Sequence, residues 1–230
     1  MSSDDEKQRA AEAALALVEP GMKLGLGSGS TASRFVALLG AKVSAGVRVI
    51  AVPTSEATRA QAQALGVPLT TLDETPELDL TVDGADEIGP GLSLIKGAGA
   101  ALLREKLVWE ASRSCVVIAD ASKHVKFLGK FLLPIEVVAF GHKTTALRIC
   151  DALAENDIGV APALRRRDGQ PVRTDGGNLI YDVACGRIAE PAALAASLKA
   201  VTGVVEHGLF LDLADRALIG GPDGVVELEP

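Results

Sequence analysis

The sequence predicts an α/β protein with a Rossmann-like, mostly parallel sheet covered by helices on both faces, and an inserted smaller α+β domain of ferredoxin-like type. Two observations predict the large sheet. Strands alternate with helices of ordinary length over the first half of the chain, and each strand is a continuous apolar run, as in parallel strands that are buried on both faces. A third observation is the order β-α-β-β-α-β in the second half, which is typical of a split βαβ domain.

The first half supplies the elements of the large domain. A helix is expected over 4–18, because apolar positions recur at helical spacing after an acidic start, and Pro20-Gly21 ends it. The alternation that follows predicts βαβ units with right-handed crossovers. The predicted strands cover 23–27, 47–52, 66–69, 78–82 and 114–119, and the predicted helices cover 32–39, 56–65 and 100–112.

The second half supplies the smaller domain. Asp168-Gly169 is a hairpin signal, and the residues 175–178 form a second turn. Pro191 suits the first turn of a helix. The predicted strands cover 134–139, 160–167, 179–183 and 204–207, the predicted helices cover 143–155 and 191–200, and a last strand over 216–219 returns to the large sheet. We therefore expect a catalytic domain of residues 1–130 and 208–230, and a small domain of residues 131–207 with a role in assembly or in covering the cleft.

Composition narrows the class of protein. The chain has 230 residues, of which 48% are hydrophobic, so a packed core is expected. The formal net charge of −7 argues against nucleic acid as the main partner. The N-terminus is acidic rather than signal-like, and Pro134 and Glu136 interrupt the most apolar later run, so no membrane association is expected. The few unpaired cysteines suit a cytoplasmic location, and the scattered histidines predict no metal site.

Polar side chains follow several predicted strands at the point where each strand ends. Ser28–Thr31 follow the first strand, Thr54-Ser55 the second, Asp83 the fourth and Lys123 the fifth, and Lys96 ends a short apolar run. Ligands of open α/β sheets bind beyond the carboxyl ends of the strands. The sequence therefore predicts a small-molecule site at this edge.

The glycine-rich loop after the first strand predicts an anion site. Its glycines let backbone N–H groups turn toward a phosphate, the helix N-terminus adds partial positive charge, and Ser28, Ser30 and Thr31 add hydroxyls. A plain turn capped by Thr31 explains the loop equally well. A dinucleotide site fits less well, because no acid ends the next strand to bind a ribose.

The stretch 83–106 gathers the groups of acid–base chemistry. Asp83, Asp86 and Glu87 form either a solvated turn or a set of carboxylates that bind sugar hydroxyls, and their place at a strand end favours the second. Lys96, which precedes a glycine turn, is well placed to neutralise an oxyanion. Glu105 is expected two turns into the following helix, on the same face as the turn, although an ordinary charged helix face would also explain it.

Four motifs in this order resemble those of A-type ribose-5-phosphate isomerases. They are GLGSGSTASRF at 25–35, TVDGADEI at 81–88, LIKGAGAALLREK at 94–106 and IADASKHVKFLGKF at 118–131. The resemblance continues through LPIEV, the Asp-Gly-Gly-Asn turn and ALIGGPDGVVEL. Ala98 departs from the pattern, since the family commonly has glycine there. We expect the alanine to narrow the conformational freedom of the backbone but not to abolish activity.

The resemblance implies interconversion of D-ribose 5-phosphate and D-ribulose 5-phosphate through a cis-enediolate, with no cofactor and no metal, in a homodimer or homotetramer. It implies that Glu105 is the general base and that Lys96 and Asp83 contact the carbonyl end of the substrate. It also implies that Asp83 assists opening of the furanose ring. The implied substrate-binding residues are Ser28, Gly29, Ser30, Thr31, Asp83, Gly84, Ala85, Asp86, Lys96, Gly97, Ala98, Gly99, Lys123 and Lys7.

Two other functions remain open at this point. A non-catalytic sugar-phosphate sensor would normally carry a DNA-binding helix-turn-helix, and the region before the first strand is too short for one. It would also have no reason to keep Glu105 and Lys96. A nicotinamide-dependent dehydrogenase would bind NADH, and we expect no such binding.

Overall fold

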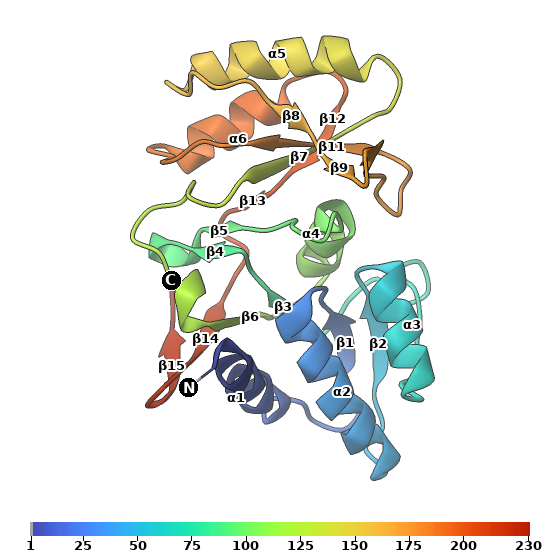
Figure 1. The fold of residues 1–230 in the computed structure, drawn as a ribbon. Coiled ribbons are helices and arrows are strands. Elements are labelled where there is room, and N and C mark those ends of the chain that lie inside the picture. Colours follow the sequence, from blue (N-terminus) through green and yellow to red (C-terminus); the bar gives the residue numbers. More distant parts are fainter. Residues whose placement is uncertain (1) are drawn as a thin grey trace. The chain divides into compact units, whose positions relative to one another are not determined.

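The computed structural model describes residues 2–230, which divide into two compact units (Figure 1). The first unit contains the chain up to Ala85, Arg104–His124 and Asp212–Pro230. The second unit contains Asp86–Leu103 and Val125–Leu211. Each unit has its own hydrophobic core.

The first unit is built on a six-stranded sheet with the order β15-β14-β6-β3-β1-β2. All neighbouring strands are parallel except β15, which pairs antiparallel with β14. The strands are β1 (Lys23–Leu26), β2 (Ile50–Pro53), β3 (Leu80–Gly84), β6 (Cys115–Asp120), β14 (Arg216–Gly221) and β15 (Gly224–Leu228). The predicted mostly parallel sheet is therefore confirmed, including the return of the last predicted strand to it.

Helices cover both faces of this sheet. The helices are α1 (Ser3–Leu15), α2 (Ser30–Ser44), α3 (Glu56–Ala64), α4 (Leu102–Glu110, whose first two residues belong to the second unit) and the 3₁₀ helix η2 (Ala121–Lys123). Leu24 and Leu26 of β1 share a core with Phe35 of α2. Gly25 points to the other face, where a Cβ would lie 2.6 Å from Val108 of α4. Within residues 2–230, no helix is both long and apolar enough to cross a membrane.

Two elements of the first unit differ from the prediction. The strand expected over 66–69 is wrong, since in the part of the chain that the structure describes Leu69 forms an isolated bridge with Ala51 of β2 rather than a strand. Pro68 lacks the N–H that a longer ladder needs. The helix expected from 100 begins at Leu102, because Ala100 has the left-handed φ of 59° and cannot extend it. Glu105 therefore lies in the first turn of α4, not two turns in.

The second unit contains a four-stranded antiparallel sheet with the order β12-β7-β11-β8. Its elements are β7 (Leu133–Val137), α5 (His142–Ala154), β8 (Ala163–Leu164), β11 (Leu179–Val183), α6 (Pro191–Lys199) and β12 (Val204–His207). Numbered along the chain, the strands lie in the order 4-1-3-2 of a ferredoxin-like domain. The two helices cover one face, because Ile135 and Tyr181 pack in one core with Ile149 of α5 and Leu194 of α6 (Figure 1).

The strand predicted over 160–167 is interrupted. It forms β8 and, after Arg165, the short strand β9 (Arg166–Arg167), which makes a hairpin with β10 (Gln170–Pro171). The turn is the predicted Asp168-Gly169, with φ of 51° and 78°. The hairpin prediction is confirmed, whereas the continuous strand is wrong.

A small three-stranded sheet of the second unit was not predicted. It has the order β13-β5-β4 and consists of β4 (Glu87–Ile88), the 3₁₀ turn η1 (Pro90–Leu92), β5 (Leu94–Ile95) and β13 (Leu209–Phe210). Two-residue strands are too short for alternation to reveal them. Because β13 pairs with β5, residues 86–103 and 208–211 cluster with the second unit, which differs from the predicted boundaries at 131 and 207. The assignment of catalysis to one domain and assembly to the other stays a prediction.

The Asp-Gly-Gly-Asn turn holds a buried carboxyl of β7. Glu136 is 1% exposed, and its Oε1 accepts hydrogen bonds from Thr174 and Asn178 at 2.9 Å each. Within the described residues, its Oε2 has no hydrogen-bond partner. Burial raises the pKa of Glu136, the Asn178 and Thr174 donors offset this in part, and the Glu206 carboxylate adds to the increase.

The raised pKa predicts a pH dependence of stability. Below the ordinary pKa of 4.5 both folded and unfolded states are protonated, and above the raised value the folded state carries a costly buried charge. Lowering the pH from about 7 to about 5 should therefore raise the Tm of the wild type relative to that of Glu136→Gln. Thermal unfolding of both proteins across this range measures the difference, and parallel Tm curves would contradict it.

Candidate active site

The glycine-rich loop lies between β1 and α2, as predicted. Helix α2 begins at Ser30, and Gly29 is its N-cap residue with φ of 96° and no side-chain cap. Capping by Thr31 is therefore wrong. A Cβ on Gly27 would lie 2.1 Å from Oδ1 of Asp83, so this backbone approach requires glycine. The loop and its helix N-terminus form an arrangement that suits a phosphate.

A cluster of hydroxyls surrounds Ser28. Its Oγ lies 2.8 Å from Oγ1 of Thr54, 2.8 Å from Oγ of Ser55 and 3.2 Å from Oγ1 of Thr58. Ser55 also caps α3 by accepting from the N–H of Thr58. Because β1 and β2 are adjacent and parallel, their carboxyl ends bring these groups together. Thr54 and Ser55 were expected at this edge because they follow a predicted strand. The contribution of Thr58 to the hydroxyl cluster was not predicted.

Asp83 is the last residue but one of β3 and is completely buried. Its Oδ1 accepts hydrogen bonds from the N–H groups of Ser28 at 3.0 Å and Gly84 at 2.7 Å, and its Oδ2 accepts from the Trp109 indole at 3.1 Å. This carboxylate therefore ties the glycine-rich loop to β3 and α4. Its predicted contact with the substrate stays a prediction.

Glu105 lies in the first turn of α4 and is 4% exposed. Its neighbour Arg104 points to α3, where Nη1 lies 2.6 Å from Oε1 of Glu56. The helix is thus fixed on both sides of Glu105, by Arg104 and by the Trp109–Asp83 hydrogen bond. A buried carboxylate on a fixed helix turn is suited to act as a general base.

Lys123 of η2 follows β6 directly, and Lys7 of α1 acts with it on Asp120, the last residue of β6. Asp120 caps η2 by accepting from Ser122, through both its N–H and its hydroxyl. Burial alone would raise the pKa of Asp120, but the Ser122 hydrogen bonds and the charges of Lys123 and Lys7 outweigh it and lower the pKa below the usual 3.8. The two predicted lysines therefore act on one carboxylate at the carboxyl edge of the sheet.

The second unit contains Lys96 and the turn that follows it. Lys96 follows β5 rather than a strand of the parallel sheet, which corrects the expectation that all the polar groups follow that sheet. Its side chain is 2% exposed, and its Nζ lies 5.4 Å from the centre of the Phe210 ring. The N–H of Lys96 donates to the Gly208 carbonyl at 2.9 Å. A buried ammonium in these surroundings interacts strongly with nearby negative charge.

The turn after Lys96 has a fixed backbone. Gly97 has φ of 115°, and a Cβ there would lie 2.9 Å from Leu102 and 3.1 Å from Pro134. The N–H of Ala98 donates to Oδ2 of Asp86 at 2.9 Å. Ala98 is not among the residues with positive φ, so its methyl group imposes no backbone strain.

Glu87 is a structural carboxylate. It is 3% exposed, and its oxygens accept from the N–H groups of Gly129 at 2.7 Å and Phe131 at 2.6 Å. These two backbone donors belong to the same unit and give Glu87 a structural role, and its expected contribution to binding sugar hydroxyls stays a prediction. Asp86 is half-buried, and its role in binding sugar hydroxyls stays a prediction.

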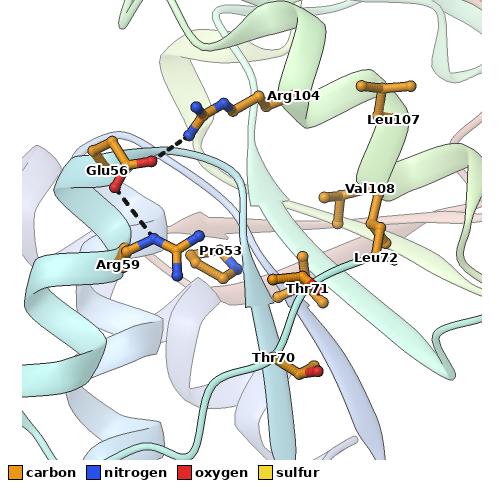
Figure 2. A pocket seen from close by; sticks show the side chains of 10 residues that line it. Pro53, Glu56, Arg59, Thr70, Thr71, Leu72, Arg104, Leu107 and Val108 are labelled. Carbon is orange, nitrogen blue, oxygen red and sulfur yellow. Dashed lines mark hydrogen bonds and ion pairs between the residues drawn. The ribbon is translucent and has the colours of Figure 1, made fainter. Parts of the chain in front are cut away.

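A cavity of about 210 Å³ lies in the first unit beside α4 (Figure 2). Arg59 and Arg104 both pair with Glu56 at its rim, as the dashed lines in Figure 2 show. The Arg104 hydrogen bond lowers the pKa of Glu56, burial opposes this, and the charge of Arg59 adds to it. Leu72, Val108 and other apolar groups form much of the remaining wall. None of the predicted site residues lines this cavity.

The chain resembles known proteins over its whole length. The sequence pattern of the family described as Ribose 5-phosphate isomerase A (phosphoriboisomerase A) matches residues 50–224. Ribose-5-phosphate isomerase A of Caulobacter sp. (strain K31) is 64% identical over 230 residues, which is all of both chains. The chain belongs to the ribose 5-phosphate isomerase A family.

Solved structures agree with this family. Ribose 5-phosphate isomerase A of Methanocaldococcus jannaschii is 38% identical, with a TM-score of 0.91 over all of both chains. A D-ribose-5-phosphate isomerase in complex with phospho-erythronic acid is 37% identical, with a TM-score of 0.93 over all of both chains. The family, the fold class and the isomerase activity predicted from the motifs are therefore confirmed.

The predicted site residues fall into two groups. The first unit brings together the loop Ser28–Thr31, Asp83, Gly84 and Ala85, and it also contains Glu105, Lys123 and Lys7. The second unit holds Asp86 and the segment 96–99. Within residues 2–230, no three His, Cys, Asp or Glu side chains form a group that could hold a metal ion. One further contact of the turn, from Arg165, has no signal in the local sequence.

Proposed function

We propose that the two groups of residues form one active site that interconverts D-ribose 5-phosphate and D-ribulose 5-phosphate. The observation that carries this proposal is membership of the ribose 5-phosphate isomerase A family, with a relative that is 64% identical over the full length of both chains. The buried base, the buried lysine and the hydroxyl-rich loop supply the groups that aldose–ketose isomerisation by proton transfer requires.

Glu105 carries the proton in this mechanism. Its carboxylate removes the proton from C2 of the open-chain aldose and returns it to C1, while the proton of the C2 hydroxyl moves to O1. The 4% exposure of Glu105 keeps bulk water away from the proton in transit. General base catalysis supplies about 10²–10⁴-fold in rate, so other groups must stabilise the enediolate.

Lys96 and the turn 97–99 stabilise the enediolate oxygens. The Lys96 ammonium is a fixed positive charge that requires no reorganisation as negative charge develops on O1 and O2. The N–H groups of the glycine turn add hydrogen-bond donors. Asp86 orients the turn through the Ala98 N–H and accepts sugar hydroxyls through its remaining lone pairs.

The phosphate lies at the N-terminus of α2. Ser28, Ser30 and Thr31 supply N–H and hydroxyl donors, and Lys123 and Lys7 supply positive charge. An anchor at the unreacting end of the substrate holds C1 and C2 at the base. Binding energy from the phosphate is thereby used for positioning.

An isomerisation assay tests the proposal. Purified protein should convert ribose 5-phosphate to ribulose 5-phosphate, and an excess of chelator should leave the rate unchanged, since only side chains move protons here. Phospho-erythronic acid, a ligand of a related enzyme, should inhibit competitively, because its carboxylate resembles the enediolate oxygens. Absence of turnover would refute the function, and turnover that stops with chelator would refute the metal-free mechanism alone.

Replacing Lys123 with alanine should mainly weaken substrate binding. Loss of one charge from the phosphate site is expected to raise KM about tenfold with a smaller change in kcat, because the lysine acts far from C1 and C2. Lys126→Ala, which removes an exposed lysine three residues away, is the matched control. A KM equal to that of the control protein would remove Lys123 from the phosphate anchor.

The proposal includes a cytoplasmic location and a homodimer or homotetramer, as the family resemblance implies. Exposed apolar side chains of the second unit support assembly, since Phe140 is 94% exposed and Leu147 is 67% exposed. Light scattering on the purified protein measures the mass, and a monomer at working concentration would refute the oligomer.

A further inference from the structure

Arg165 connects the small domain's sheet to the glycine turn within the second unit. Its Nη1 donates to the carbonyl oxygens of Gly97 at 2.9 Å and Ala98 at 3.0 Å. Its Nε donates to Oδ2 of Asp182 at 2.7 Å, and its Nη2 donates to Oδ1 of the same carboxylate. The Arg165 and Asp182 side chains are only 14% and 13% exposed. An ion pair this well shielded, with two-pronged geometry, is among the stronger ones.

The position of this pair follows from the pleat of the sheet. Tyr181 and Val183 of β11 face the core under α5 and α6, so Asp182 between them faces the other side. Asp182 is the register partner of Pro134 in β7. A Cβ on Gly97 would lie 3.1 Å from Pro134, so the turn packs against the same face. The sheet thus presents both a surface for the turn and a carboxylate that aims the arginine at it.

The contacts fix the direction of two peptide groups. Because the C=O and N–H of a trans peptide point in opposite directions, a bound carbonyl determines where the next N–H points. In the Gly97–Ala98 peptide, Arg165 holds the carbonyl and Asp86 accepts from the N–H. In the Ala98–Gly99 peptide, Arg165 holds the carbonyl, so the Gly99 N–H points away from the guanidinium.

The Gly99 N–H is available to a ligand. Gly99 is exposed, and within residues 2–230 no hydrogen-bond acceptor for its N–H is found. The neighbouring turn residues have left-handed φ values of 115° at Gly97 and 59° at Ala100. Such a backbone needs contacts from outside to keep one conformation, and Arg165 supplies two of them.

We propose that Arg165, aimed by Asp182, is a positioning residue that holds the turn 97–99 so that the Gly99 N–H faces the enediolate oxygens of the substrate. This inference rests on the proposed isomerase function. It gives the small domain a direct part in catalysis, through one arginine on its sheet. A lysine cannot replace it, because one ammonium cannot span a carboxylate and two carbonyls in a planar fork.

The test compares Arg165→Ala, Arg165→Lys and Asp182→Asn with the wild type. Arg165→Ala should lower kcat about 10–100-fold with little change in KM for ribose 5-phosphate, since the phosphate anchor is intact and only the turn is misplaced. Inhibition by phospho-erythronic acid should weaken by a similar factor. Arg165→Lys should also have a lowered kcat, and Asp182→Asn should show a smaller decrease in kcat.

Arg166→Ala is the matched control, because this neighbouring arginine is exposed and its side chain donates a hydrogen bond to the Gly169 carbonyl of its own hairpin rather than to the glycine turn. It should keep wild-type kcat. Guanidinium ions, at concentrations far below those that unfold proteins, should restore part of the kcat of Arg165→Ala and none to a variant of the base Glu105. Recovery of kcat by guanidinium would show that Arg165 positions the turn rather than only stabilising the fold.

Two results would overturn the inference about Arg165. Neither would affect the proposed function, provided that the wild-type protein turns over ribose 5-phosphate. The first is an Arg165→Ala variant with wild-type kcat. The second is a loss of kcat that guanidinium does not reverse and that accompanies a lowered Tm, since this outcome assigns Arg165 to folding alone. A wild-type protein without isomerase activity would instead refute the proposed function itself.

Discussion

Replacing Glu105 with glutamine is expected to lower kcat by at least about two orders of magnitude, since general base catalysis supplies about 10²–10⁴-fold. Glutamine has the same shape but accepts no proton at neutral pH. Binding of phospho-erythronic acid should be retained, because the phosphate loop and Lys96 are unchanged. Stopped-assay kinetics and inhibitor titration measure the two effects separately.

The control for this variant lies on the same helix. Glu110→Gln removes an exposed carboxylate at the end of α4, five residues after the base, and should leave kcat unchanged. Loss of exchange between the C2 proton and solvent in Glu105→Gln would support proton transfer by this residue. Activity near that of the wild type would rule out Glu105 as the base.

The sequence predicted the large sheet well because its strands carry their own signal. Apolar runs such as Cys115–Asp120 are buried at every position, which is what parallel strands covered on both faces require. Short elements carried no such signal. The strand Glu87–Ile88 pairs with the nearby strand Leu94–Ile95, which in turn pairs with Leu209–Phe210 more than a hundred residues later. No local pattern in strands this short predicts such pairing.

The candidate site was predictable where chemistry is local. The loop around Ser28 and the lysine before the glycine turn could each be singled out from residue type and spacing, whereas Glu105 was distinguished from an ordinary charged helix residue only by the family resemblance. The other features of the site depend on contacts between residues that are far apart in the sequence. Glu87 looked equivalent to Asp83 and Asp86 in sequence, and its hydrogen bonds from the N–H groups of Gly129 and Phe131, more than forty residues later, could not be predicted from the local pattern.

Arg165 illustrates the same limit from the other direction. In sequence it is one of three consecutive arginines, and nothing local separates it from Arg166 or Arg167. The break between β8 and β9, together with Asp182 on the paired strand, selects it for contact with the turn. A residue that acts by holding another residue's backbone cannot be recognised from its own surroundings in the chain.

The second large effect is expected from Lys96→Met. Removing a preorganised charge from an oxyanion site typically costs about 10²–10³-fold in kcat. Methionine fills the space of the lysine stem beside Phe210, so packing of the three-stranded sheet should be kept. Lys130→Met, at an exposed position, controls for loss of positive charge and should keep wild-type kcat.

The ratio of two effects distinguishes stabilisation of the enediolate from simple attraction of an anionic substrate. If Lys96 acts on the charge that develops during reaction, Lys96→Met should lower kcat far more than it raises KM. It should also weaken binding of phospho-erythronic acid more than binding of inorganic phosphate, because only the former carries a carboxylate at the position of the enediolate oxygens. Equal weakening of both ligands would assign Lys96 to general electrostatic attraction and would leave the glycine turn, held by Arg165, as the main stabiliser of the enediolate.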